Sequence, residues 1–196
     1  MFFEGDPHNA ECARAFFANH PATRGKQFPV VAGNFVTTDN INEIIHSVTG
    51  GWSGDIDVFS LDIDGIDYHI WDALTVISPR IVVVEIQEFL GPTKRLTRPY
   101  DPKFRADGIP SMGASLGAYV FLAKKKGYRL VGCIRNGFNA FFVRNDVKAD
   151  LDHVFGTGEY APEGCFAHVD QRWQKVLDQR LKESTKHTWI DPSTAS

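Results

Sequence analysis

The chain has 196 residues, a formal net charge of −3 and 43% hydrophobic residues, which fits one ordinary globular domain and excludes disordered and fibrous classes. With 21 Lys and Arg residues against 24 Asp and Glu residues, it has no global positive charge for non-specific binding to nucleic acid or an anionic membrane. Residues 1–6 lack the pattern of a secretion signal, and the longest apolar run, residues 81–86, is too short to span a membrane. Binding of a small molecule is therefore favoured over binding of nucleic acid or a membrane.

The number and spacing of the cysteines indicate whether the protein resides in a reducing or an oxidising compartment. Cys12, Cys133 and Cys165 are odd in number and match neither metal-ligand spacing nor a disulfide framework. They are expected to be reduced thiols, and the protein is expected to be cytoplasmic.

Short apolar runs alternate with longer amphipathic stretches, which is typical of a mainly parallel sheet flanked by helices. Up to residue 86 we expect strands and helices to alternate, with strands at 2–4, 28–32, 57–61 and 80–86 and helices at 9–19, 41–48 and 68–74. A long loop follows at 91–110, and then a helix at 115–126. The last elements are strands at 128–134 and 139–144, joined by a hairpin turn at 136–137, and a helix at 168–181. These elements divide into an α/β domain at 1–150 and a C-terminal helical extension and tail at 151–196. The strand at 80–86 is rich in Val and Ile and belongs at the centre of the sheet.

Three carboxylates follow the strand at 57–61: Asp62, Asp64 and Asp67. Ligands in open α/β sheets bind outside the carboxyl ends of the strands, so these side chains are candidates for a site. Structural roles compete with this interpretation, because Asp64-Gly65 fits a turn and Asp67 fits a helix cap. Asp62 has no comparable structural explanation.

This segment shares features with two known acidic motifs. An EF-hand loop needs its glycine later and a Glu at position twelve, where this chain has Ala73, so that interpretation fails. The segment also resembles the Asp-x-Asp-Gly-Thr motif of phosphatases of the haloacid dehalogenase type, except that Ile66 stands in the threonine position. A phosphatase that uses Asp62 and Asp64 is therefore kept as an alternative.

A wider resemblance covers most of residues 2–146. It is carried by the segments EGDPHNAECARAFFANHP, FPVVAG, TTDNINEII, FSLDIDGIDYHIWDAL, SPRIVVVEIQEFLGP, PYDP, GASLGAYVFLAKKKGYRLVGC and NAFFV. In order and spacing they resemble FkbM-like class I methyltransferases, which use S-adenosylmethionine. The resemblance implies a three-layer Rossmann-like sheet, mainly parallel with a C-terminal antiparallel hairpin, and methyl transfer to an oxygen of a small-molecule acceptor.

The resemblance also implies roles for single residues. Glu4 would bind the ribose of S-adenosylmethionine, Gly33 and Asn34 would lie near its adenine, and Asp62 would lie near the sulfonium and the acceptor. Oxygen-directed members of this broad class often bind a divalent ion at two neighbouring strand ends. The corresponding ligands for Mg²⁺ are Asp62, Asp64, Glu85 and Gln87, of which Asp62, Asp64 and Glu85 would be the catalytic residues. The competing interpretation of Glu85 is a buried acid paired with Arg80 or Arg135.

The chain departs from this family at its start, because the first strand and its glycine-rich cofactor turn have no counterpart. Either the chain is an N-terminally truncated fragment, or the sheet is rebuilt and cofactor binding is lost or reshaped, which includes a non-catalytic remnant. A missing first strand leaves two strand edges open, and open edges invite partners. We therefore expect the gap to close within the chain, the chain to pair as a homo-oligomer, or the chain to aggregate.

Overall fold

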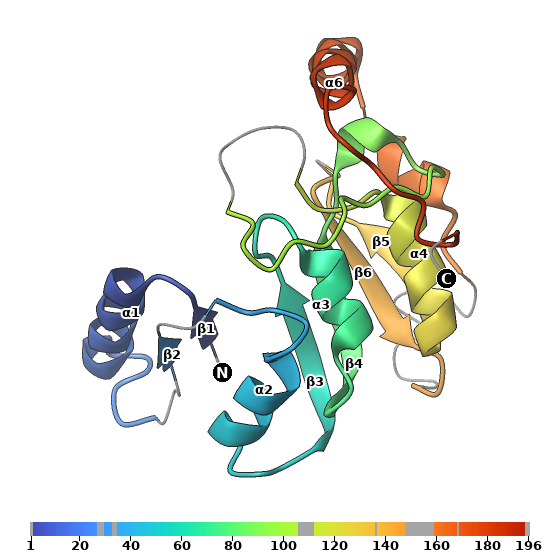
Figure 1. Ribbon diagram of the computed structural model, residues 1–196. Coiled ribbons are helices and arrows are strands. Elements are labelled where there is room, and N and C mark those ends of the chain that lie inside the picture. Colours follow the sequence, from blue (N-terminus) through green and yellow to red (C-terminus); the bar gives the residue numbers. More distant parts are fainter. Residues whose placement is uncertain are drawn as a thin grey trace. The chain divides into compact units, whose positions relative to one another are not determined.

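The structure is a computed structural model that describes residues 2–26, 30–32, 35–105, 112–135, 137–147, 159–167 and 169–194. The chain divides into two units, residues 1–53 with 73–76 and residues 54–72 with 77–196 (Figure 1). The domain boundary expected at residue 150 lies outside the described residues.

The first unit pairs two short strands in parallel, β1 (Phe2–Glu4) and β2 (Val30–Ala32). Helix α1 (Pro7–Asn19) is capped by Asp6, whose side chain accepts a hydrogen bond from the Asn9 N–H at 2.9 Å. Helix α2 (Ile41–Val48) buries three isoleucines on one face. The Asn42 side chain on this helix donates to Ala73 O and accepts from Thr75 N–H, each at 2.9 Å, which joins residues 73–76 to this unit.

The second unit contains a four-stranded sheet in the order β3-β4-β6-β5, formed by β3 (Gly54–Leu61), β4 (Ile77–Glu85), β6 (Asn139–Arg144) and β5 (Tyr128–Cys133). The expected α/β class, the inner place of β4 and the antiparallel C-terminal pair are confirmed. The expectation of a mainly parallel sheet is wrong here, because only β3 and β4 run parallel while β6 is antiparallel to both of its neighbours. Asn136 of the expected hairpin turn lies outside the described residues.

Helices α3 (Asp67–Ala73) and α4 (Leu116–Lys126) lie against one face of this sheet (Figure 1). Aromatic side chains pack between the helices and the sheet. The Trp71 ring centroid lies 5.3 Å from that of Phe142 on β6 and 6.2 Å from that of Tyr119 on α4. The opposite face carries a separate cluster of Val131, Val143 and Val147.

The C-terminal helix α6 (Gln171–Ser184) adds no further layer on this sheet. It packs instead on a short 3₁₀ helix, η1 (Glu88–Leu90), through Phe89, Leu90 and Leu177. The described residues therefore do not form a clear three-layer Rossmann fold, which corrects that expectation. None of the helices described above is long and apolar enough to cross a membrane.

The cysteine expectation is wrong for two of the three residues. Cys133, the last residue of β5, forms a disulfide with Cys165 in the 3₁₀ helix η2 (Pro162–Phe166), with their Cα atoms 5.3 Å apart. Cys12 is free and exposed. The pair is 32 residues apart in sequence, so its proximity depends on the folded path of the chain and not on spacing.

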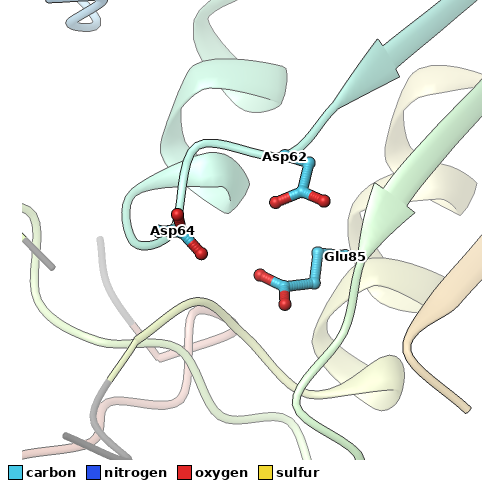
Figure 2. Close-up of side chains that lie close together, drawn as sticks. All are labelled: Asp62, Asp64 and Glu85. Atoms are coloured by element: carbon cyan, nitrogen blue, oxygen red, sulfur yellow. The ribbon is translucent and has the colours of Figure 1, made fainter. Parts of the chain in front are cut away.

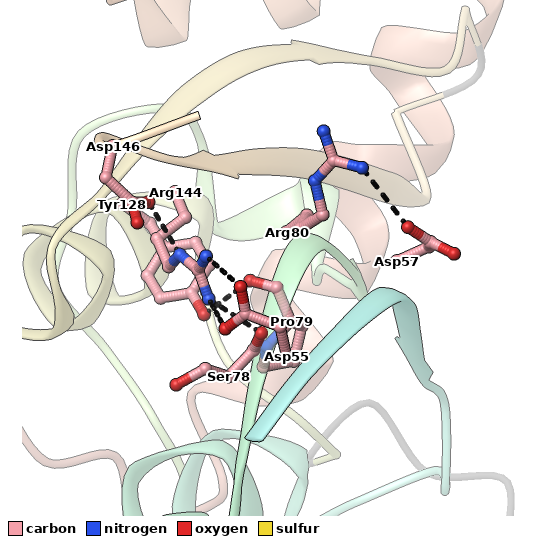
Figure 3. A network of polar contacts seen from close by, with 8 residues as sticks. All are labelled: Asp55, Asp57, Ser78, Pro79, Arg80, Tyr128, Arg144 and Asp146. Carbon is pink, nitrogen blue, oxygen red and sulfur yellow. Dashed lines mark hydrogen bonds and ion pairs between the residues drawn. The ribbon is translucent and has the colours of Figure 1, made fainter. Parts of the chain in front are cut away.

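Arg144, the last residue of β6, bonds to residues of β3 and β4 near the start of β3 (Figure 3). Its Nη1 and Nη2 donate to the Oδ1 and Oδ2 atoms of Asp55 on β3, at 2.8 and 2.9 Å. Nη1 also donates to Ser78 O on β4 at 2.7 Å, and Nε donates to Asp146 Oδ1 at 2.6 Å. Bidentate arginine–carboxylate pairs are stronger than single contacts. The Arg144 guanidinium holds the pKa of Asp55 below its ordinary value.

Replacing Arg144 with Ala is expected to lower the melting temperature at pH 7 by roughly 2 to 4 °C. A carboxylate with a lowered pKa stabilises the fold above its ordinary pKa, and that stabilisation is lost as the pH falls through the lowered value. The difference from wild type should therefore shrink below about pH 4. Arg80→Ala is the matched control, since Arg80 makes one exposed contact, with Asp57 at 3.3 Å. Equal melting temperatures for wild type and Arg144→Ala would contradict the role of the network.

Candidate functional site

Three carboxylates meet at the edge of the sheet where the parallel strands β3 and β4 end (Figure 2). Leu61, the last residue of β3, lies opposite Val84 on β4, so Asp62 and Glu85 take the next positions on neighbouring strands. Asp64 comes from the turn that follows β3. One oxygen from each of Asp62, Asp64 and Glu85 lies within 4.8 Å of the others. The structure thus brings together three of the four residues predicted as metal ligands.

Asp67 shapes the turn that carries Asp62 and Asp64. Its side chain is 1% exposed and accepts hydrogen bonds from the Ile63 and Gly65 N–H groups, each at 2.8 Å. Asp64 adopts a left-handed backbone conformation with φ 56°. Asp67 therefore has a structural role, but not the expected one of a helix cap: it is the first residue of α3, and its carboxylate fixes the path of the preceding turn around the other two acids.

Burial and neighbouring acids raise the pKa values of Glu85 and Asp62. Burial raises the pKa of Glu85 to about 8, with further contributions from Asp62, Asp67, Asp64 and Glu88. Burial and the charge of Asp64 also raise the pKa of Asp62. Like charges this close do not all ionise at neutral pH without a compensating cation. A divalent cation would replace the proton and balance the charge.

The alternative of an arginine partner for Glu85 finds no support in the described part of the chain. Arg80 pairs with Asp57. The charges that act on the pKa of Glu85 are all acidic, and Arg135 is not among them.

Tyr119 is a buried group beside the same carboxylates that the sequence analysis missed. Its side chain is 0% exposed, and its hydroxyl has no hydrogen-bond partner among the described residues. The charges of Asp67, Glu85 and Asp62 add to the effect of burial in raising its pKa, so the phenol lies within the field of the acidic cluster. A buried hydroxyl without a partner is uncommon and calls for an explanation. The only sequence signal was a tyrosine within a predicted helix.

The segment at 98–104 covers the acidic turn. A Cβ atom on Gly65 would collide with the Phe104 ring, which shows how closely the ring lies on the turn. The Arg98 guanidinium stacks 3.4 Å from the centre of the Phe104 ring. Gly113 N–H donates to Gly65 O at 2.9 Å, and Arg98 N–H donates to Gly113 O at 3.3 Å. Part of the expected long loop is thus held against the site.

The Gly65→Ala substitution is expected to lower the free energy of unfolding by about 1 to 3 kcal/mol, because the new methyl group must displace the Phe104 ring. Urea unfolding would measure this effect. The double variant Gly65→Ala, Phe104→Ala is the matched control and should lose less than the sum of the two single variants. Strict additivity would mean that the two residues are not in contact.

His69 is held by the same segment. Its ring lies 5.4 Å from the Tyr100 ring, and its Nε2 lies 2.9 Å from Arg98 O. Because a carbonyl oxygen only accepts hydrogen bonds, Nε2 carries the proton. Burial lowers the pKa of His69, so the ring is neutral at pH 7.

Gln87 points toward the C-terminal helix. It is buried, and its Oε1 accepts a hydrogen bond from Arg180 Nη2 of α6 at 3.5 Å. Its role as a fourth metal ligand stays a prediction.

The residues expected to bind S-adenosylmethionine are less well defined. Glu4 ends β1 in the other unit, and its Oε1 accepts a hydrogen bond from Asp6 N–H at 2.9 Å. Gly33 and Asn34 lie outside the described residues.

Comparisons of the chain with protein-family models, curated proteins and solved structures gave no significant match. The resemblance to FkbM-like methyltransferases therefore stays a prediction from the sequence.

Proposed function

We propose that this chain is a divalent-cation-dependent methyltransferase that moves a methyl group from S-adenosylmethionine to an oxygen of a small-molecule acceptor. The observation that carries the proposal is the convergence of Asp62, Asp64 and Glu85 within 4.8 Å at the carboxyl ends of two parallel strands. The cation half of the proposal rests on this geometry. The methyl-transfer half rests on the sequence resemblance.

The donor set fits a hard cation. Mg²⁺ and Ca²⁺ prefer oxygen ligands, and three carboxylates supply them from two rigid strand ends. Two observations indicate that the site lacks a positive charge or a ligand: the pKa of Glu85 is raised, and the Tyr119 hydroxyl has no hydrogen-bond partner among the described residues. A bound Mg²⁺ would lower the pKa of an acceptor hydroxyl next to it. The chain's own part is to fix the ligands through Asp67 and to cover the turn with Phe104.

Glu4 is chemically suited to a ribose, because a carboxylate accepts hydrogen bonds from a diol. One of its oxygens already accepts from Asp6 N–H, so the cofactor would compete for that oxygen or use the other one. Titration of the protein with S-adenosylmethionine in a calorimeter tests this half. Cation binding without cofactor binding would retain the metal site and reject the methyltransferase.

Asp62→Asn is expected to weaken binding of Mn²⁺, a stand-in for Mg²⁺, by at least tenfold at pH 8, because a charged ligand is lost. This corresponds to about 1.4 kcal/mol. Calorimetry on the full chain is the measurement. Asp57→Asn is the matched control: Asp57 lies on β3, the strand that Asp62 follows, but it pairs with Arg80, so its substitution should leave the affinity unchanged. Equal affinity in wild type and Asp62→Asn, or no binding at millimolar Mn²⁺, would remove the metal site.

The phosphatase stays as a second candidate because Glu85 adds a third carboxylate to the Asp62 and Asp64 pair. Hydrolysis of p-nitrophenyl phosphate in Mg²⁺ separates it from the methyltransferase, since only a phosphatase would show turnover that Asp62→Asn abolishes. If the protein bound neither the cation nor the cofactor and hydrolysed no phosphate ester, the chain would be a non-catalytic remnant.

The cytoplasmic location stays a prediction. The Cys133–Cys165 disulfide counts against it, because disulfides persist mainly in oxidising compartments.

A further inference from the structure

Strand β3 lies at one edge of the four-stranded sheet and is paired on one side only. Its ladder to β4 runs from Gly54 to Leu61, and in the described part of the chain no other backbone group bonds to it. Alternate residues of an edge strand turn their N–H and C=O groups outward. Since β3 has eight residues, about half of them carry unpaired backbone groups along this edge.

The opposite edge of the same sheet is partly covered. Tyr160 N–H donates to Leu130 O of β5 at 2.8 Å, and the Cys133–Cys165 disulfide fixes η2 beside the end of that strand. A register irregularity between Leu130 and Gly132 further distorts β5. Covering segments and bulges are the usual protections of an edge strand, and β5 has both. Within the described residues of its own unit, no segment bonds to the β3 edge, and its ladder to β4 has no bulge.

The side chains of β3 also lack the usual protection against pairing. The strand GDIDVFSL contains no lysine or proline, and Val58 at its middle is 54% exposed. Its two acids are already neutralised, Asp55 by Arg144 and Asp57 by Arg80 (Figure 3). The β3 edge therefore presents backbone N–H and C=O groups without hydrogen-bond partners, and side chains with little net charge.

We propose that β3 is the dimerisation edge, and that it pairs antiparallel with β3 of a second copy about a two-fold axis at Val58. In this register Val58 faces its counterpart, Ile56 faces Ser60, and Asp57 faces Phe59. No acid stands directly opposite another acid, whereas an axis at Asp57 would oppose two of them. An isologous pair uses the β3 edge of each four-stranded sheet, and because Tyr160 and η2 lie along β5, we expect assembly to stop at two copies.

Sedimentation velocity of the full chain over a hundredfold concentration range tests the proposal. Wild type is expected to form a reversible dimer. Val58→Lys should raise the dissociation constant at least tenfold, because it places two like charges opposite each other at the axis. Val58→Thr, which keeps the β-branched shape, should retain the dimer. Val176→Lys is the surface control, since Val176 is 40% exposed on α6, and it should also retain the dimer.

Cross-linking tests the register. In a Cys12→Ser background, Val58→Cys is expected to form an intermolecular disulfide on mild oxidation, because the two positions face each other at the axis. Ser60→Cys should cross-link far less, since it faces Ile56. A monomer at every concentration would overturn the proposal. So would a dimer that Val58→Lys leaves intact, a dimer in which Val58→Cys does not cross-link, or an open-ended oligomer.

Discussion

Replacing Glu85 with Gln is expected to stabilise the cation-free protein at pH 8.5 and to leave its stability at pH 5 almost unchanged. The pKa of Glu85 rises from its ordinary value of 4.5 to about 8 on folding. Between these values the folded state keeps a proton that the unfolded state releases, so wild-type stability falls as the pH rises through this window. Glutamine resembles the protonated acid but does not ionise, so the variant should not lose stability as the pH rises.

The expected gain for Glu85→Gln is about 2 kcal/mol. The full pKa change corresponds to about 5 kcal/mol, and solvent screening of this partly exposed side chain reduces it. Urea unfolding in a chelator, at pH 5 and at pH 8.5, would measure the difference. Glu43→Gln, which changes an exposed acid on α2, is the control and should show no pH-dependent gain. Parallel pH profiles for wild type and Glu85→Gln would show that Glu85 ionises normally.

The same substitution should abolish high-affinity Mn²⁺ binding, since it removes one of the three carboxylates. A variant that is more stable but loses its ligand is characteristic of a functional site, where unfavourable electrostatics are retained for binding. A structural acid would show the opposite pattern, with stability lost and no ligand to lose.

The sequence predicted local structure well where the signals are local. The helix expected at 115–126 is observed at Leu116–Lys126, where Ser115 caps its start and Gly127, with φ 82°, ends it. The strand expected at 139–144 is observed with the same bounds. Strand direction was predicted less well, because periodicity shows that a segment is a strand but not which neighbour it pairs with or in which direction.

In the candidate site, too, features that depend on neighbouring residues were predicted and contacts between distant segments were not. Asp62 and Asp64 were predicted from their place after a strand, and Glu85 was added to them as what the family resemblance implies. The structure brings the three together because β3 and β4 run parallel and end at the same edge of the sheet. Contacts between segments distant in sequence were missed. Phe104 lies on Gly65 and Tyr119 lies near the acids only because the chain returns to this edge, which no spacing encodes.

The second large effect is expected at Arg180, which joins the C-terminal helix α6 to the strand end that carries Glu85. Arg180 pairs with Glu88, a side chain only 2% exposed, and its guanidinium lies 5.0 Å from the centre of the Phe89 ring. Burial raises the pKa of Glu88, and the charge of Arg180 opposes that rise. Removing one partner of a buried ion pair leaves an uncompensated charge, which typically costs several kcal/mol.

Arg180→Ala is therefore expected to lower the free energy of unfolding at pH 7 by about 3 kcal/mol. Without Arg180 no charge opposes the effect of burial on the pKa of Glu88, so keeping this carboxylate ionised in the folded state costs stability above the ordinary pKa of the acid. The loss should shrink below about pH 4, where both states are protonated. Glu88→Gln in the Arg180→Ala background removes the unpaired charge and should recover about half of the lost stability in urea unfolding. If the double variant were no more stable than Arg180→Ala alone, the loss would come from the packing of the arginine stem on Phe89 and not from the buried charge of Glu88.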